Sequence, residues 1–329
     1  MKRLRFQRHP SKICTANIPG AMKKGFKSAC GLVFFFVIRG AERLLSVQGL
    51  HWILNSIVFV RAAVNTALKK PGASAPAPDF LRTPRTGRTA RQYRQNHYLN
   101  HFLEFFPERL AEARWSNGCR IEGLERLWQA GQSRRPVVLA FCHFGSYFLL
   151  RFWLRAAGVP AATFIGGQSA RRAAAMRFKD RFSPFPEIPT AFYQDQLRAA
   201  AEFLAAGNPL LMPIDAPAGK QMNVPFGDGW TFQMATGAVR LAARHGAELI
   251  PCSITDEGRW RFHIRLGHPA PEEFLAAEAG WVRAGKHLLD EMRPVFQAHP
   301  EQCAADLLRC LKPNPSAAAP PTSEPIKRP

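Results

Sequence analysis

Short apolar runs alternate with longer stretches of helical periodicity from residue 91 to residue 267. The apolar runs, which predict buried strands, are 136–141, 161–167, 209–217, 247–255 and 259–267. The periodic stretches, which predict amphipathic helices, are 91–110, 121–132, 148–160, 191–208 and 233–246, with 169–182 as a further candidate and 218–232 as a Gly- and Pro-rich loop. This alternation predicts an α/β fold with a mixed, mainly parallel sheet flanked by helices on both faces.

The first third of the chain has a different pattern. Two hydrophobic runs, 29–38 and 44–60, are separated by charged residues and have Lys and Arg on their outer sides. Neither reaches the roughly 20 uncharged residues of a simple spanning helix, so we expect a hairpin or a monotopic membrane anchor. A cleaved signal peptide and a buried helix pair are the alternatives, but no small-residue cleavage pattern follows the first run and the basic flanks argue against burial.

The same pattern predicts the domain organisation. Residues 1–70 form the basic, hydrophobic anchor, and the Pro-, Ala- and Arg-rich residues 71–88 form a linker. Residues 89–312 form the α/β domain, and the Pro-, Ala- and Ser-rich residues 313–329 form a disordered tail.

The excess of Lys and Arg favours binding to an anionic surface. The formal net charge is +21, and residues 1–120 hold 21 Lys and Arg against 5 Asp and Glu. Because apolar runs lie between these basic residues and no nucleic-acid motif is present, we expect contact with an anionic membrane surface and not with nucleic acid.

Cysteine and histidine spacing gives no cofactor or metal site. The seven cysteines are scattered and form no CxxC pair, which indicates a reduced, cytosol-facing protein without a zinc site. His97 and His101 lie one helical turn apart and could bind a metal, but they lack an acidic or Cys companion, so a structural face is the preferred interpretation.

Residues that could take part in catalysis lie at the ends of two predicted strands. The run 136–141 ends in Cys142, His143, Phe144 and Gly145, and the run 209–217 presents Asp215. A His where a buried strand gives way to a helix is well placed to act as a general base. Strand exits at one edge of a parallel sheet should bring His143 and Asp215 to one crevice, although a turn or cap role for Asp215 and a core role for His143 stay open.

Together these segments resemble a known family. The order CHFGSYF, PIDAPAGK, VPFGDGWTFQMATGAVRLAARHGAELIPCSI and AHPEQCAADLLR, preceded by RQYRQNHYLNHFLEFFP, is similar to the lauroyl/myristoyl acyltransferases of lipid A biosynthesis, within the lysophospholipid acyltransferase superfamily. The resemblance covers roughly residues 88–311. It implies a glycerolipid acyltransferase-like fold at the cytoplasmic face of a bacterial inner membrane. It also implies transfer of a fatty acyl group from an acyl-carrier protein or acyl-CoA thioester to a hydroxyl of a lipid or lipid-like acceptor.

The chain departs from the family at its central motif, which is a His, four residues, and then Asp or Glu. His143 matches the base, but Phe148 stands at the position of the acid. In serine proteases an orienting Asp contributes about 10⁴-fold to the rate, so the loss matters. Asp215 could supply the carboxylate instead, the fold could bind an acylated carrier or lipid without catalysis, or Cys142 could act as a nucleophile.

The resemblance also implies further site residues. Arg177 and Arg181 are candidates for the family's oxyanion-stabilising or phosphate-gripping Arg, with a solvated helix face as the alternative. Substrate contacts are expected from residues near the base and in the VPFG segment, namely Gly145, Ser146, Phe148, Phe226 and Gly227. Phe226 has a core interpretation as well.

Overall fold

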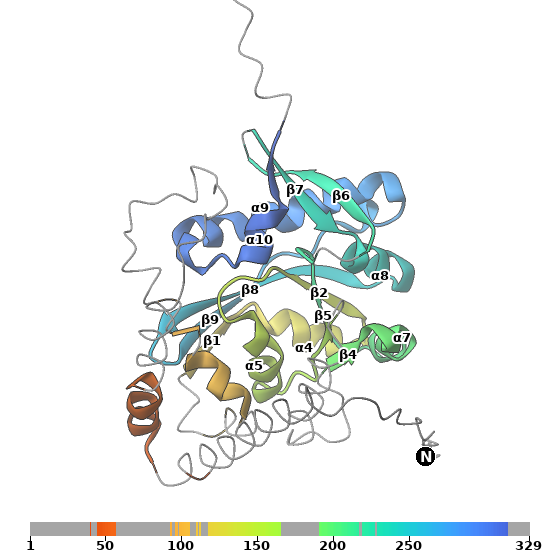
Figure 1. Cartoon of the computed structure of the whole chain (residues 1–329). Coiled ribbons are helices and arrows are strands. Elements are labelled where there is room, and N and C mark those ends of the chain that lie inside the picture. Colours follow the sequence, from red (N-terminus) through yellow and green to blue (C-terminus); the bar gives the residue numbers. More distant parts are fainter. Residues whose placement is uncertain are drawn as a thin grey trace, which may run out of the picture. The chain divides into compact units, whose positions relative to one another are not determined.

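The computed structural model describes a large central part of the chain (Figure 1). The described residues are 40, 45–56, 93, 96, 97, 99–105, 110, 112, 118–165, 191–216, 219–227 and 229–314.

A seven-stranded sheet with the order β1-β9-β8-β2-β5-β3-β4 forms the centre of the fold. Only the β8–β9 pair is antiparallel among the pairs of this sheet in the described residues. Its strands are β1 Cys119–Glu122, β2 Val137–Phe141, β3 Ala162–Ile165, β4 Ala191–Tyr193, β5 Leu210–Pro213, β8 Glu248–Gly258 and β9 Arg261–Leu266. All five residues of β2 are buried, as expected for a central strand of a parallel sheet covered on both faces.

Helices flank this sheet, as the alternating pattern predicted. In Figure 1, α8, α9 and α10 lie on one side of the sheet, and α4 and α5 lie on the other. The helices are α4 Leu124–Gln132, α5 Leu150–Ala156, α7 Leu197–Ala205, α8 Gly237–His245, α9 Trp281–Ala298 and α10 Ala305–Cys310. Short 3-10 turns are η2 His101–Phe105, η5 Tyr147–Leu149, η6 Gln194–Gln196, η7 Glu272–Phe274, η8 Glu278–Gly280 and η9 Pro300–Gln302. The mixed, mainly parallel α/β architecture is therefore present.

A second, three-stranded sheet packs against α9. It has the order β10-β7-β6, with β6 Gln221–Pro225, β7 Trp230–Ala235 and β10 Leu311–Pro313. Gly285 of α9 faces it closely, since a Cβ at that position would lie 2.8 Å from Cε of Met222 and 2.9 Å from Cγ2 of Val224. The absence of a side chain at Gly285 lets the helix approach the sheet.

Several predicted boundaries are wrong, for local reasons. The expected helix 121–132 begins with strand β1, and Gly123, at a φ of 83°, separates that strand from α4. The expected helix 191–208 begins with β4, since Ala191, Phe192 and Tyr193 pair with β3. The expected loop 218–232 contains β6 and the first part of β7, and the helix expected from residue 233 begins at Gly237 because β7 runs to Ala235.

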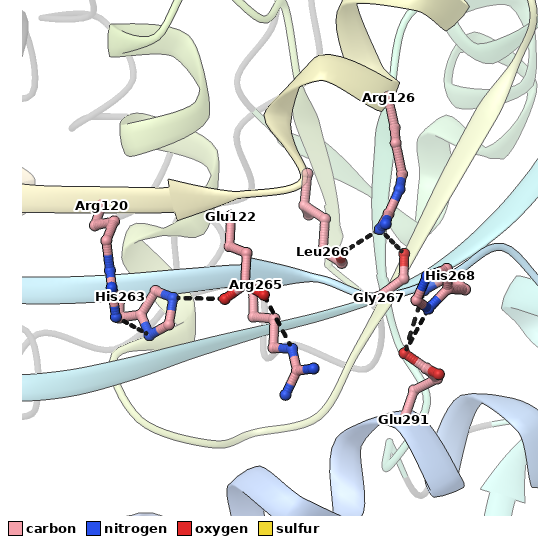
Figure 2. A network of polar contacts seen from close by, with 9 residues as sticks. All are labelled: Arg120, Glu122, Arg126, His263, Arg265, Leu266, Gly267, His268 and Glu291. Carbon is pink, nitrogen blue, oxygen red and sulfur yellow. Dashed lines mark hydrogen bonds and ion pairs between the residues drawn. The ribbon is translucent and has the colours of Figure 1, made fainter.

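Polar contacts join the edge strand β1 and the helix after it to their neighbours (Figure 2). Nη2 of Arg120 lies 3.0 Å from Nδ1 of His263, and Nε2 of His263 lies 3.1 Å from Oε2 of Glu122. Arg126 of α4 donates to the carbonyls of Leu266 and Gly267 at 2.7 and 2.6 Å. The first two contacts are exposed and contribute little each, whereas Arg126 satisfies two carbonyls where β9 ends.

Most of the predicted anchor, the whole linker 71–88 and residues 315–329 of the tail lie outside the described residues. Residues 47–56 are helical, with Leu50 and Leu54 buried and the ring of His51 5.0 Å from that of Trp260. In the described part of the chain, no helix combines the length and apolar character needed to cross a membrane. The first two residues of the predicted tail belong to the small sheet, because Pro313 is in β10 and Asn314 donates to the carbonyl of Gly229.

Candidate active site

The parallel pairing of β2 and β5 brings His143 and Asp215 together. Their register pairs Phe141 with Pro213, and the N–H of Ile214 continues the ladder by donating to the carbonyl of Phe141. His143 and Asp215 each lie two residues beyond those paired positions, so they meet just past the carboxyl ends of neighbouring strands. The juxtaposition expected from the sheet topology is present.

One carboxylate makes two hydrogen bonds to one residue here. Oδ1 of Asp215 lies 2.7 Å from Nδ1 of His143, and Oδ2 accepts the backbone N–H of His143, also at 2.7 Å. Asp215 is fully buried, whereas the side chain of His143 is 20% exposed. Beside an ionised carboxylate, which can only accept, a neutral imidazole carries its proton on Nδ1 and its lone pair on Nε2. This is the arrangement of a general base held by an acid.

Aromatic rings line the imidazole of His143. The ring of Tyr147 meets it edge to face with centroids 4.4 Å apart, and the ring of Phe141 lies 6.2 Å away. Such walls restrict the orientation of the imidazole and lower its contact with water.

Phe148, at the position where the resembled acyltransferases have an acid, is linked to His143 only through Tyr147, whose ring lies 5.7 Å from that of Phe148 in the described contacts. It stacks on His101 with centroids 3.9 Å apart and planes 7° from parallel, and His97 meets it edge-on at 5.3 Å. Burial, with His101 as the second cause, lowers the pKa of His97 to about 4, so this imidazole is neutral at neutral pH. Within the described ranges, no group of three His, Cys, Asp or Glu is arranged to hold a metal ion.

The thiol of Cys142 is poorly suited to act as a nucleophile. Cys142 is 3% exposed, and burial raises its pKa well above the usual value, with Asp215 adding to the effect. A nucleophilic Cys needs an accessible thiolate, so the geometry disfavours the interpretation that used Cys142.

The turn that carries His143 depends on Gly145. This residue has a φ of 57°, and a Cβ on it would lie 1.9 Å from the carbonyl oxygen of Ile254 on β8. Any side chain would push the turn away from β8, so Gly145 is required by the close approach of two backbones. Ser146 follows it and is fully buried, and its hydroxyl accepts a hydrogen bond from Asn100 at 2.8 Å.

Two segments distant in sequence hold this turn. From residues 299–304, the carbonyl of Gln302 accepts the N–H of Gly145, and the N–H of Ala304 donates to the carbonyl of His143, both at 3.0 Å. From the other segment, the hydroxyl of Tyr93 donates to the carbonyl of Gly145 at 3.0 Å. The sequence motifs did not indicate a role for any of these residues, although the segment AHPEQCAADLLR contains Gln302 and Ala304.

The remaining predicted site residues lie elsewhere. Phe226 is 1% exposed and packs with Phe232 in the core cluster, which agrees with its alternative interpretation. Gly227, at a φ of 67°, follows β6 close to Arg293. Arg177 and Arg181 lie outside the described residues.

Comparison with family models gives no match, and comparison of the sequence with curated proteins gives none either. Among solved structures, the chain is similar to the crystal structure of the 1-acyl-sn-glycerophosphate (LPA) acyltransferase PlsC from Thermotoga maritima. The two share 12% sequence identity over 82% of this chain and 97% of that chain, with a TM-score of 0.38. A TM-score of this size does not establish a shared fold, so the function proposed below depends on the site geometry and the sequence motifs.

Proposed function

We propose that the protein is an acyltransferase that moves a fatty acyl group from a thioester donor to a hydroxyl of a lipid or lipid-like acceptor. The observation that carries the proposal is the contact of 2.7 Å between Nδ1 of His143 and the buried carboxylate of Asp215. The resemblance of the sequence motifs to the lipid A acyltransferases supplies the reaction class. An acyl-carrier protein or acyl-CoA is the donor that fits this class.

The proposed step uses Nε2 of His143 as the base. Nε2 takes the proton of the acceptor hydroxyl while the oxygen attacks the thioester carbonyl carbon, so a C–O bond forms. The C–S bond then breaks, and the leaving sulfur takes the proton back from the imidazolium. Products are an ester and a free thiol. Asp215 keeps the proton on Nδ1 and stabilises the transient positive charge, as the Asp of a serine protease triad does.

A non-catalytic acyl-carrier or lipid-binding homologue is the alternative. Its basis was the absence of an acid at position 148. The Asp215 contact weakens that basis, because both tasks of the missing acid, orientation and charge stabilisation, are available from β5. The catalytic proposal is therefore preferred.

The test is an assay of the full-length protein with labelled lauroyl, myristoyl and palmitoyl thioesters of acyl-carrier protein and of CoA. A bacterial total lipid extract serves as acceptor, and both thiol release and label in the lipid fraction are measured. General bases contribute roughly 10²–10⁴-fold, so we expect His143→Ala and Asp215→Asn to lower the rate by at least about 100-fold. His263→Ala, at the exposed edge contact of β9, is the control and should keep the wild-type rate.

Two results would contradict the proposal in different ways. Wild-type protein that releases no thiol and labels no lipid with any donor would favour the binding homologue. Wild-type turnover that survives unchanged in His143→Ala would show that another residue is the base.

We also infer that the N-terminal region places the enzyme at an anionic membrane surface, at the cytoplasmic face of a bacterial inner membrane. Basic residues flanking apolar runs in residues 1–70 support this, because such segments are attracted to anionic lipid head groups.

A further inference from the structure

The His143 turn lies between two acids that come from the strands on either side of β2. On one side, Asp215 lies two residues beyond the end of β5. On the other side, β8 runs past the end of β2, because Cys252 pairs with Phe141 and the strand continues to Gly258. This extension carries Asp256, which is 8% exposed and does not contact His143 directly in the described contacts.

A bulge in β8 sets the position of Asp256. The register of β8 with β9 shifts between Asp256 and Gly258, and the N–H of Gly258 donates to Oδ1 of Asp256 at 2.7 Å. Bulges re-aim side chains, and here the carboxylate closes a short loop with its own backbone. One oxygen of Asp256 is thus occupied locally, and Oδ2 is left to bind another segment.

Asn100 occupies that second oxygen and links it to the turn. Its Nδ2 donates to Oδ2 of Asp256 at 2.6 Å and to Oγ of Ser146 at 2.8 Å. Asn100 and Ser146 are 1% and 0% exposed, so neither hydrogen bond competes with water. A single amide therefore joins the β8 extension to the residue that ends the His143 turn.

Gln302 makes the second link. Its side chain accepts the N–H of Asp256 and donates to the carbonyl of the same residue, both at 2.9 Å, while its own carbonyl accepts the N–H of Gly145. The side chain and the main chain of Gln302 thus bind Asp256 and the turn at the same time. Asp256 is therefore bound both by Asn100 and by Gln302.

We propose that Asp256, Asn100 and Gln302 form a positioning cluster that sets the orientation of the His143 imidazole through the turn 143–146. These are positioning residues, since none of them touches the reacting atoms. The cluster is buried, and both carboxylate oxygens of Asp256 and both polar side-chain atoms of Gln302 are hydrogen-bonded. Buried hydrogen-bond networks of this kind favour one arrangement of the segments that they join. Burial raises the pKa of Asp256, opposed by the donors from Gly258 and Asn100. The role of these residues in catalysis depends on the proposed function, but their effect on His143 does not.

An exchange of the two polar residues gives a sharp test. The bond from Nδ2 of Asn100 to Oδ2 of Asp256 is 2.6 Å long. Asn100→Asp places a second carboxylate at this contact, and Asp256→Asn replaces the carboxylate that accepts from Asn100 by an amide. The double variant Asn100→Asp/Asp256→Asn restores the pairing with roles reversed, because Asn at 256 donates to Asp at 100, the hydroxyl of Ser146 donates to that carboxylate, and the bond from Gly258 keeps its acceptor.

The readout needs no substrate. In the full-length protein, the rate of modification of His143 by diethyl pyrocarbonate is measured by peptide mass spectrometry and divided by the rate for His268, whose side chain is 70% exposed. We expect this ratio to change severalfold in both single variants and to return to the wild-type value in the double variant. If the assay of the proposed function succeeds, kcat should fall about tenfold in Asn100→Asp with the KM for the acyl donor retained, since small misplacements of a base act on the chemical step.

Two controls keep the outcome interpretable. Thr163→Val removes a buried hydroxyl on β3, away from the cluster, and should lower the melting temperature without changing the ratio. If Asn100→Asp does not fold, Gln302→Met carries the test, because it loses both side-chain bonds to Asp256 and keeps the main-chain bond to Gly145. An unchanged ratio in the folded single variants, or an equal change in Thr163→Val, would overturn the proposal. A wild type without turnover would count against the proposed function alone.

Discussion

Asp215 fixes His143 more tightly than a ring contact alone would. Its two oxygens bind the ring and the backbone N–H of the same residue, and the side chain is inaccessible to solvent. The imidazole is therefore held relative to its own backbone, and the strand register determines where the acid lies. An acid supplied in this way does not have to follow the His on the same turn. Position 148 is then available for an aromatic side chain.

Placing an acid at position 148 by Phe148→Glu, as in the acyltransferases that the sequence motifs resemble, should therefore not raise activity. The new carboxylate would replace a ring that stacks on His101 and lies beside His97, and Asp215 already occupies Nδ1 of His143. We expect thioester consumption at or below the wild-type rate. Phe148→Leu, which removes the stacking without adding charge, is the matched control. A gain of about tenfold or more in the Glu variant alone would mean that the wild-type site lacks an effective acid.

At the scale of elements, the sequence predicted the features that depend on residues close together in the chain. The continuous apolar run in β2 and the exits at His143 and Asp215 followed from residues close together in the chain. Strands β6 and β7 were missed because the Gly and Pro residues around them indicate a loop, and β4 was missed because its three apolar residues also fit the helical period that follows. Asn100 and Asp256 are 156 residues apart, and no spacing rule relates them. Only the folded sheet shows that they meet.

Replacing Gly by Ala at one position in α9 and at one in α4 tests how closely α9 packs on the small sheet. Gly285 and Gly131 are both within helices, where replacing Gly by Ala gains about 0.5–1 kcal/mol from propensity. At Gly131 a Cβ meets nothing within 4 Å, so Gly131→Ala should raise the free energy of unfolding by about that amount. At Gly285 the Cβ would lie 3.0 Å or less from the side chains of Val224 and Met234, which are buried, and of Met222, which is partly buried. Such overpacking costs about 1–3 kcal/mol.

We therefore expect opposite signs from the two variants in urea unfolding, with Gly285→Ala destabilised. If both variants are stabilised, the side chains of Met222, Val224 and Met234 can move aside at little cost, and the close packing of α9 is not a constraint.

At the scale of the whole molecule, basic charge is concentrated near the start of the chain. Residues 1–44 contain ten Lys and Arg and one Glu, together with the first apolar run. The α/β part that carries His143 and Asp215 begins well after them. The proposed transfer to a lipid hydroxyl needs its acceptor at a membrane surface, and a basic apolar segment would be attracted to an anionic surface without contributing to the chemistry.

Deleting residues 1–44 should separate membrane binding from the site. The cut leaves the helix 47–56 in place, whose Leu50 and Leu54 are buried, so the core should keep its melting temperature. Full-length protein should sediment with vesicles of phosphatidylglycerol and phosphatidylcholine, and bind them less as salt rises, because each basic residue near an anionic surface contributes about 1 kcal/mol that salt screens. The truncated protein should stay in the supernatant. Its His143 should still react with diethyl pyrocarbonate at the wild-type rate. A truncated form that sediments equally well would place the membrane contact after residue 44, and the exposed Trp52 and Ile53 would be the first residues to replace.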